Sequence, residues 1–259
     1  MSVIKEHIKK LVHPVKYFPS RGERRRVSTA RPLVTGHRRV YFYHIRKTAG
    51  TSLNMAFMGL AGNGHDLNER LQLEDKWLIE DGYVFVRAIK HLIEEGFYFQ
   101  GGSHIPAYRL SLPEKTFRVT CLRDPVERVI SHYRMLVHYR ETGQNRAWNE
   151  MPWLGETPSL GTFLDRIPKA HLLRQLAMFS ERLDPAEAGD LVNSLEFVMH
   201  QSRFDADLER LGAMLELPLK PYRAKSYQNK VEVDEADVAR LREMMEPEYR
   251  MMGMLEGAG

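Results

Sequence analysis

Residues 41–57, YFYHIRKTAGTSLNMAF, constrain the fold more than any other part of this sequence. The segment begins as an apolar, aromatic run typical of a buried strand and ends in a pattern typical of a helix. A small polar turn carrying Lys47 joins the two. Free backbone N–H groups and the positive end of the helix dipole face such a turn, which makes it a site for an anion. The segment therefore predicts a strand–turn–helix unit that binds a negatively charged group.

The side chains of this turn suit the same purpose. Lys47 brings a full positive charge, and the hydroxyls of Thr48, Thr51 and Ser52 are hydrogen-bond donors. Gly50 allows a close approach of the backbone. The G-x-x-x-x-G-K-[ST] pattern of nucleotide kinases is absent, because the lysine precedes the glycine. Taken alone, the turn is also compatible with a capped helix beside a solvated lysine.

The rest of the chain alternates between strand-like and helix-like segments, which predicts an α/β protein in three layers: a central, mainly parallel sheet flanked by helices. We expect a basic extension over residues 1–36 and one domain over 37–259. The expected strands are 40–45, 97–102, 116–122 and 196–200. The expected helices are 51–60, 67–95, 125–140, 159–180, 185–195, 203–215 and a terminal helix, with long loops at 141–158 and 218–233.

Two further segments carry candidate functional residues. VTCLRDPVERVISHYRML, residues 119–136, reads as a strand followed by a helix with Asp124 as N-cap, and Glu127 would complete a capping box. The apolar stripe of this helix leaves Arg123 and Ser131 unexplained, although Arg123 could simply pair with Asp124 or Glu127. His104 follows another expected strand, at the edge where such folds bind ligands. A loop histidine can equally be structural.

Taken together, these segments resemble the sulfotransferases. HIRKTAGTSL is similar to the 5′-phosphosulfate-binding loop of the carbohydrate group, which reads like H-I-P-K-T-G-G-T-[ST]-L. LRDPVERVISHYR resembles the 3′-phosphate-binding segment, whose arginine and serine also lie eight positions apart. SHIPAYRLSLP resembles the histidine-containing segment between them. Arg46 and Ala49 replace the usual proline and first glycine, and a tight turn at Ala49 would need a negative φ. The resemblance spans roughly residues 39–250.

The resemblance implies a P-loop-like fold and a defined donor, 3′-phosphoadenosine 5′-phosphosulfate (PAPS), with adenosine 3′,5′-bisphosphate as product and no metal. It implies that Arg123 and Ser131 hold the 3′-phosphate, that Lys47 neutralises the leaving group and that His104 is the general base. The 5′-phosphosulfate would be held by a run of loop residues: Lys47, Thr48, Ala49, Gly50, Thr51 and Ser52. The late-loop residues around 223–230 that complete the nucleotide site stay open.

The acceptor is less well defined. The group resemblance implies a saccharide hydroxyl, and acceptor contacts are expected from residues 62–82 and 141–158. Two other functions stay open: a P-loop-type small-molecule kinase, and a catalytically inactive relative that binds nucleotide. The presence of Lys47, His104, Arg123 and Ser131 argues against the inactive relative. The missing kinase pattern, and the lack of a clear Mg²⁺-binding aspartate after a strand, argue against the kinase.

Charge is unevenly distributed along the chain. Residues 1–39 contain eleven Lys/Arg and two acids, a local charge of +9, so a net charge of +4 leaves the remainder at −5. Neither this balance nor any motif indicates nucleic-acid binding.

One cysteine excludes an internal disulfide and favours a reducing, cytoplasmic compartment. Residues 3–16 predict an amphipathic helix that docks on the domain, lies weakly on an anionic membrane or targets an organelle. The oligomeric state stays open.

Overall fold

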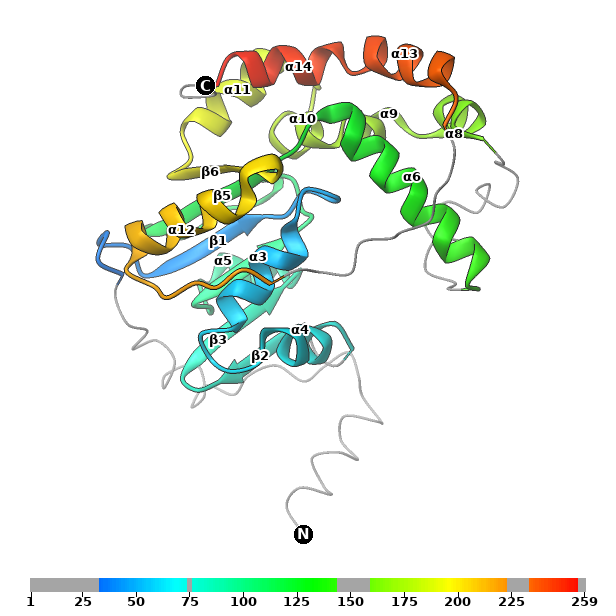
Figure 1. Ribbon diagram of the computed structural model, residues 1–259. Helices are drawn as coiled ribbons and strands as arrows, with labels where there is room; N and C mark the ends of the chain where they lie inside the picture. Colours follow the sequence, from blue (N-terminus) through cyan, green and yellow to red (C-terminus); the bar gives the residue numbers. More distant parts are fainter. Residues whose placement is uncertain (1–32, 74–75, 144–158, 223–232, 256–259) are drawn as a thin grey trace.

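A six-stranded sheet in the order β2-β3-β4-β1-β5-β6 forms the centre of the molecule (Figure 1). The computed structural model describes residues 33–73, 76–143, 159–222 and 233–255. β2 is antiparallel to β3, and the other pairings are parallel. The strands are β1 (Arg39–Tyr43), β2 (Trp77–Glu80), β3 (Tyr83–Arg87), β4 (Gln100–Ser103), β5 (Thr116–Leu122) and β6 (Phe197–His200).

Helices cover both faces of this sheet, which confirms the predicted three-layer α/β fold with a mainly parallel centre (Figure 1). One face packs against α3 (Gly50–Met58), α4 (Gly64–Leu73) and α12 (Phe204–Leu215). The other packs against α5 (Lys90–Glu94), α6 (Pro125–Glu141), α8 (Leu160–Arg166), α9 (Lys169–Leu172), α10 (Arg174–Phe179), α11 (Pro185–Asn193), α13 (Glu235–Met244) and α14 (Glu246–Gly253). Two short 3₁₀ turns, η1 (Ala107–Arg109) and η3 (Gln201–Arg203), complete the described elements.

Strand β1 shows why the aromatic run at its start becomes a central strand. Val40 and Phe42 point into the cluster under α3, whereas Tyr41 and Tyr43 point into the cluster on the opposite face. A parallel strand covered on both faces needs large side chains in both directions. Burial of each such side chain contributes about 1.5–3 kcal/mol to folding.

The prediction of a helix over residues 67–95 is wrong for its middle part. Helix α4 ends at Leu73, and β2 and β3 form a hairpin before the short helix α5. The turn of the hairpin is Asp81–Gly82, with φ values of 46° and 77°. An Asp-Gly pair supplies the two left-handed residues that a tight hairpin requires. The charged residues around this pair concealed the strand pattern.

The predicted strand 116–122 is confirmed as β5, and α6 begins at Pro125 as expected. Asp124 caps α6 by accepting a hydrogen bond from the Glu127 backbone N–H at 2.9 Å. The expected helix over 159–180 is instead three short helices, α8, α9 and α10, because Pro168 lies between the first two. Loops were expected at 141–158 and 218–233, and most of each, residues 144–158 and 223–232, lies outside the described residues.

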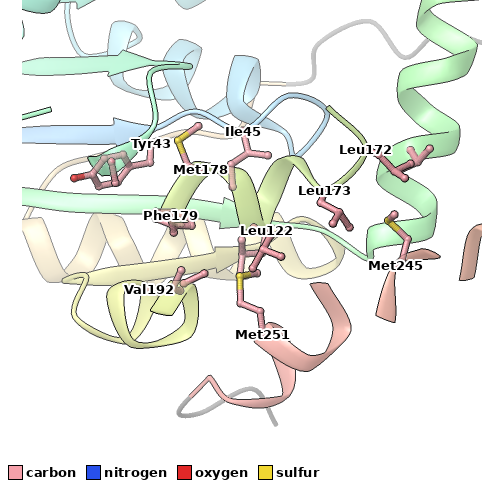
Figure 2. Packing of buried hydrophobic residues seen from close by; sticks show 14 of the residues in the cluster. Tyr43, Ile45, Leu122, Leu172, Leu173, Met178, Phe179, Val192, Met245 and Met251 are labelled. Atoms are coloured by element: carbon pink, nitrogen blue, oxygen red, sulfur yellow. The ribbon is translucent and has the colours of Figure 1, made fainter. Parts of the chain in front are cut away.

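The C-terminal helices pack against the end of β5. Figure 2 shows Met251 of α14 directed toward Leu122, the last residue of β5. Met178 and Phe179 of α10 belong to the same buried cluster. Helix α14 is thereby held beside the segment that carries Arg123.

Candidate active site

The three segments singled out in the sequence follow three neighbouring strands. β4, β1 and β5 lie side by side, and their parallel register pairs Tyr43 with both Ser103 and Thr120. The His44 backbone N–H donates to the Ser103 carbonyl at 3.0 Å. The carboxyl ends of these strands therefore bring the lysine turn, His104 and Arg123 to one edge of the sheet, where ligands bind in open α/β sheets.

The lysine turn is wound more tightly than expected. Lys47 and Ala49 have φ values of 72° and 66°, so the condition under which alanine suits a tight turn, a negative φ, is not met at Ala49. Left-handed backbone costs an alanine roughly 1–2 kcal/mol, and glycine relieves this cost. The Thr48 hydroxyl donates to the Ile45 carbonyl at 3.0 Å and closes the turn. Thr48 can therefore offer its backbone N–H to a ligand while its hydroxyl holds the loop.

Helix α3 begins directly behind this turn, with its N-terminus directed at the turn. Its N-cap, Ala49, provides no side-chain hydrogen bond to the first N–H groups of the helix. Thr51 and Ser52 lie half-buried in the first turn. The site thus combines a helix N-terminus, hydroxyl donors and Lys47, a set of groups that fits an anion.

Gly50 is required by a neighbouring ring. A Cβ atom at this position would lie 2.0 Å from Cδ2 and 2.1 Å from Nε2 of His44. His44 is buried and stacks on Phe42, with ring centroids 5.1 Å apart. The glycine therefore permits His44 to pack beneath the start of α3. His44 has no predicted role, although it begins the motif quoted above.

Lys47 is held in an environment that disfavours its charge. Burial, and secondarily the neighbouring Arg123, lower the pKa of Lys47 to about 8. The Arg123 guanidinium lies at the Lys47 backbone, with Nη1 donating to the carbonyl at 3.4 Å. Two cations brought together at a helix N-terminus fit a polyanionic ligand that would offset their repulsion.

His104 has a defined orientation next to this turn. Its Nδ1 contacts the His44 backbone carbonyl, and the two imidazole rings lie 4.3 Å apart between centroids. A carbonyl oxygen only accepts hydrogen bonds, so Nδ1 carries the ring hydrogen and Nε2 keeps its lone pair. The position of His104 is further fixed by Arg174, whose Nη2 donates to the His104 carbonyl at 3.2 Å. His104 can therefore accept a proton at Nε2.

Burial, with a smaller contribution from neighbouring charges, keeps His104 neutral. Burial is the largest influence and lowers its pKa to about 4, although its hydrogen bond to His44 acts in the opposite direction. Three arginines, Arg46, Arg174 and Arg87, lower the pKa further. Neither Arg87 nor Arg174 was predicted to lie near the site. Arg87 is the last residue of β3, within the segment 67–95 that was expected to be helical. A strand ending in arginine behind the Asp81–Gly82 turn is the signal that could have identified Arg87.

Arg123 and Ser131 are placed on the same strand–helix unit. The Arg123 guanidinium pairs with the Glu127 carboxylate at 3.3 Å, so the alternative explanation by an ion pair is present in the structure. Ser131 lies half-buried in the second turn of α6. In the described part of the chain, no hydrogen bond joins Ser131 to Arg123.

The described residues contain no group of three His, Cys, Asp or Glu side chains that could hold a metal ion. Over the same residues, no helix has the length and apolar character needed to cross a bilayer. The candidate nucleotide residues around 223–230, and all but the first three residues of the expected acceptor loop 141–158, lie outside the described ranges.

Comparisons with known proteins agree with this geometry. No curated protein matches the chain. The sulfotransferase family matches residues 31–171, more than half of the 259 residues, and this range includes the lysine turn, His104, Arg123 and Ser131. The chain therefore belongs to the sulfotransferase family.

Proposed function

We propose that this sulfotransferase moves the sulfuryl group from PAPS to a hydroxyl of a saccharide acceptor. The observation that carries the proposal is the placement of His104, with Nε2 available as a base, beside a lysine-bearing helix N-terminus. An anion site and a neutral base at one sheet edge are the two groups that sulfuryl transfer to a hydroxyl requires.

The residues at the turn fit the donor. The backbone N–H groups from Thr48 to Ser52, with the hydroxyls of Thr51 and Ser52, would hold the 5′-phosphosulfate. Arg123 and Ser131 would hold the 3′-phosphate, and a guanidinium suits this task because it stays charged and can bind two phosphate oxygens. When bound, PAPS supplies an activated sulfuryl group and leaves as adenosine 3′,5′-bisphosphate.

The protein contributes a proton acceptor and a positive charge to the reaction. His104 Nε2 would take the proton of the attacking acceptor hydroxyl, a contribution usually worth about 10²–10⁴ in rate. Lys47 would stabilise the negative charge that grows on the oxygen bridging phosphorus and sulfur. The negative charges of the donor would raise the pKa of His104 from about 4, and so strengthen the base when both substrates are present.

The saccharide acceptor is supported by the resemblance of residues 44–53 and 122–134 to the carbohydrate group. A kinase acting on a small molecule and an inactive nucleotide-binding relative are the competing functions. The kinase is disfavoured by the absence of G-x-x-x-x-G-K-[ST] from the sequence.

A thermal-shift measurement separates the sulfotransferase from the kinase. Adenosine 3′,5′-bisphosphate should raise the melting temperature, and ATP with Mg²⁺ should raise it much less, because only the former presents a 3′-phosphate to Arg123. Arg123→Ala should remove the preference. A larger shift with ATP and Mg²⁺ would instead support the kinase.

A further inference from the structure

We infer that Gln175 and Glu248 are positioning residues of the donor site, which fix the backbone of Arg123 so that its side chain faces the 3′-phosphate. The inference rests on the proposed function, in which Arg123 binds that phosphate. Both residues lie outside the segment that matches the sulfotransferase family, residues 31–171.

Gln175 holds both backbone groups of Arg123. Its Oε1 accepts from the Arg123 N–H at 2.9 Å, and its Nε2 donates to the Arg123 carbonyl at 2.9 Å. β5 ends at Leu122, whose partner His200 is the last residue of β6, so Arg123 lies beyond the strand pairing. A carboxamide is suited to this position because it both donates and accepts, in place of a further paired strand.

Glu248 in turn fixes Gln175. Its Oε1 accepts from the backbone N–H groups of Gln175 and Leu176 at 2.7 and 3.2 Å, which caps helix α10. Its Oε2 accepts from Gln175 Nε2 at 3.0 Å. Gln175 and Glu248 are both fully buried, so neither side chain has water as an alternative partner.

Helix α14, which carries Glu248, also contacts Asp124, the residue after Arg123. The hydroxyl of Tyr249 donates to Asp124 Oδ2 at 2.8 Å, while Asp124 Oδ1 caps α6. Arg128, one turn into α6, is fully buried with its Nε 3.9 Å from Glu248 Oε2. Its guanidinium also donates to the Leu172 carbonyl. The connection between β5 and α6 is therefore held from two sides.

The contacts of Gln175 fix the backbone position of Arg123 and leave the charge of its side chain unchanged. The Arg123 side chain is partly exposed, and its contacts with the exposed Glu127 carboxylate and the Lys47 carbonyl are long, at 3.3 and 3.4 Å. The position of the Arg123 backbone therefore contributes strongly to where the guanidinium lies. A guanidinium grips a phosphate with two parallel hydrogen bonds, and this geometry tolerates little displacement. Loss of the Gln175 contacts should therefore weaken recognition of the 3′-phosphate specifically.

The test compares two nucleotides that differ only in the 3′-phosphate. Calorimetry would measure the affinity of adenosine 3′,5′-bisphosphate and of adenosine 5′-monophosphate for the full chain, well below each variant's melting temperature. Gln175→Leu should reduce the ratio of the two affinities by about tenfold or more, as loss of a supporting contact commonly does. The affinity for the monophosphate should change little. Glu248→Gln should act in the same direction, since its amide would meet the Gln175 amide donor to donor.

Two controls make the outcome decisive. Leu211→Ala, in α12 on the opposite face, lowers stability without touching Arg123 and should preserve the ratio. If Gln175→Leu does not fold, Gln175→Met tests the same contact, because its flexible thioether side chain has a similar length and cannot donate to the Arg123 carbonyl. An unchanged ratio in the folded Gln175 variant, when Arg123→Ala loses it, would overturn the inference alone. A wild-type protein without preference for the bisphosphate would overturn the proposed function instead.

Discussion

Lys47 is a residue whose charge the fold opposes and the proposed donor would favour. Its pKa of about 8 in the free protein means that about half of the side chains have lost their proton at pH 8. A bound polyanion raises this pKa, so binding of adenosine 3′,5′-bisphosphate at pH 8 should take up as much as about half a proton. Calorimetry in buffers of different ionisation enthalpy measures this uptake. Lys47→Met should abolish it, and equal heats in all buffers for the wild type would contradict the role of Lys47.

His104 should make the folded protein sensitive to acid. Its folded pKa of about 4 lies below the ordinary value of 6.5, so between these two pH values the unfolded chain binds more protons than the folded protein. The stabilisation is present above pH 6.5 and is lost as the pH falls toward 4. Between pH 7.5 and 5.5, the free energy of unfolding should fall by about 1 kcal/mol more in the wild type than in His104→Gln. Urea unfolding at the two pH values measures the difference.

His44 and His132, which are buried and whose pKa values are also lowered by burial, act in the same direction in both proteins. The contribution of His132 therefore cancels in the comparison. His104 also lowers the pKa of His44, so the measured difference includes the coupling between these two rings. Equal pH dependence of the wild type and His104→Gln would show that His104 is not held in the environment described above.

At the scale of elements, a carboxylate in the first turn of α6 competes with the proposed 3′-phosphate for the guanidinium of Arg123. The Glu127 carboxylate, 61% exposed, pairs with Arg123 and places a negative charge beside the proposed 3′-phosphate site. Glu127→Gln removes this charge and frees the guanidinium, so adenosine 3′,5′-bisphosphate should bind up to about fivefold more tightly, within the range of an exposed ion pair. Calorimetry at low salt measures the gain. Weaker binding would show that Glu127 orients Arg123 rather than competing for it.

The elements that could be predicted from sequence are those with strong local signals. One is β1 with its lysine turn, and the other is β5 with the Asp124 cap of α6. In each, the residues that form the pattern lie within a short stretch of the sequence. The β2–β3 hairpin also has a local signal, at Asp81–Gly82, which the surrounding charges concealed. The side-chain roles proposed for the turn depend on a donor and remain predictions.

The contacts that could not be predicted join residues far apart in the chain. Gln175 lies 52 residues from Arg123, and Glu248 lies 73 residues from Gln175. Each is an ordinary polar residue within a helical pattern. Their function in the fold arises only when β5, α10 and α14 are packed together, and no spacing in the sequence indicates that packing.

At the scale of the whole molecule, the basic residues 1–30 remain to be placed, since they lie outside the described range. Leu33 is buried under the sheet, so a truncated chain should begin at residue 31 to keep it. We expect residues 3–16 to dock on the domain, so the truncated chain should melt at a lower temperature. The second possibility is weak, salt-sensitive adsorption of the full chain to phosphatidylserine vesicles, with about 1 kcal/mol from each basic residue near the headgroups, which the truncated chain would lose. Co-sedimentation at low salt measures the adsorption of both chains. Equal, negligible pelleting would exclude this membrane contact, and a lower melting temperature after truncation would favour docking on the domain.

The central claim is that a base and an anion site at one sheet edge transfer a sulfuryl group from PAPS to a saccharide. Incubation with PAPS carrying a radiolabelled sulfuryl group and a panel of saccharide, lipid and phenolic acceptors tests it most directly. We predict a labelled saccharide product, formed by the wild type and reduced by at least about a hundredfold in His104→Ala, while that variant still binds adenosine 3′,5′-bisphosphate with nearly wild-type affinity. Transfer that persists in His104→Ala above about a tenth of the wild-type rate, or label that reaches none of the saccharides, would contradict the account.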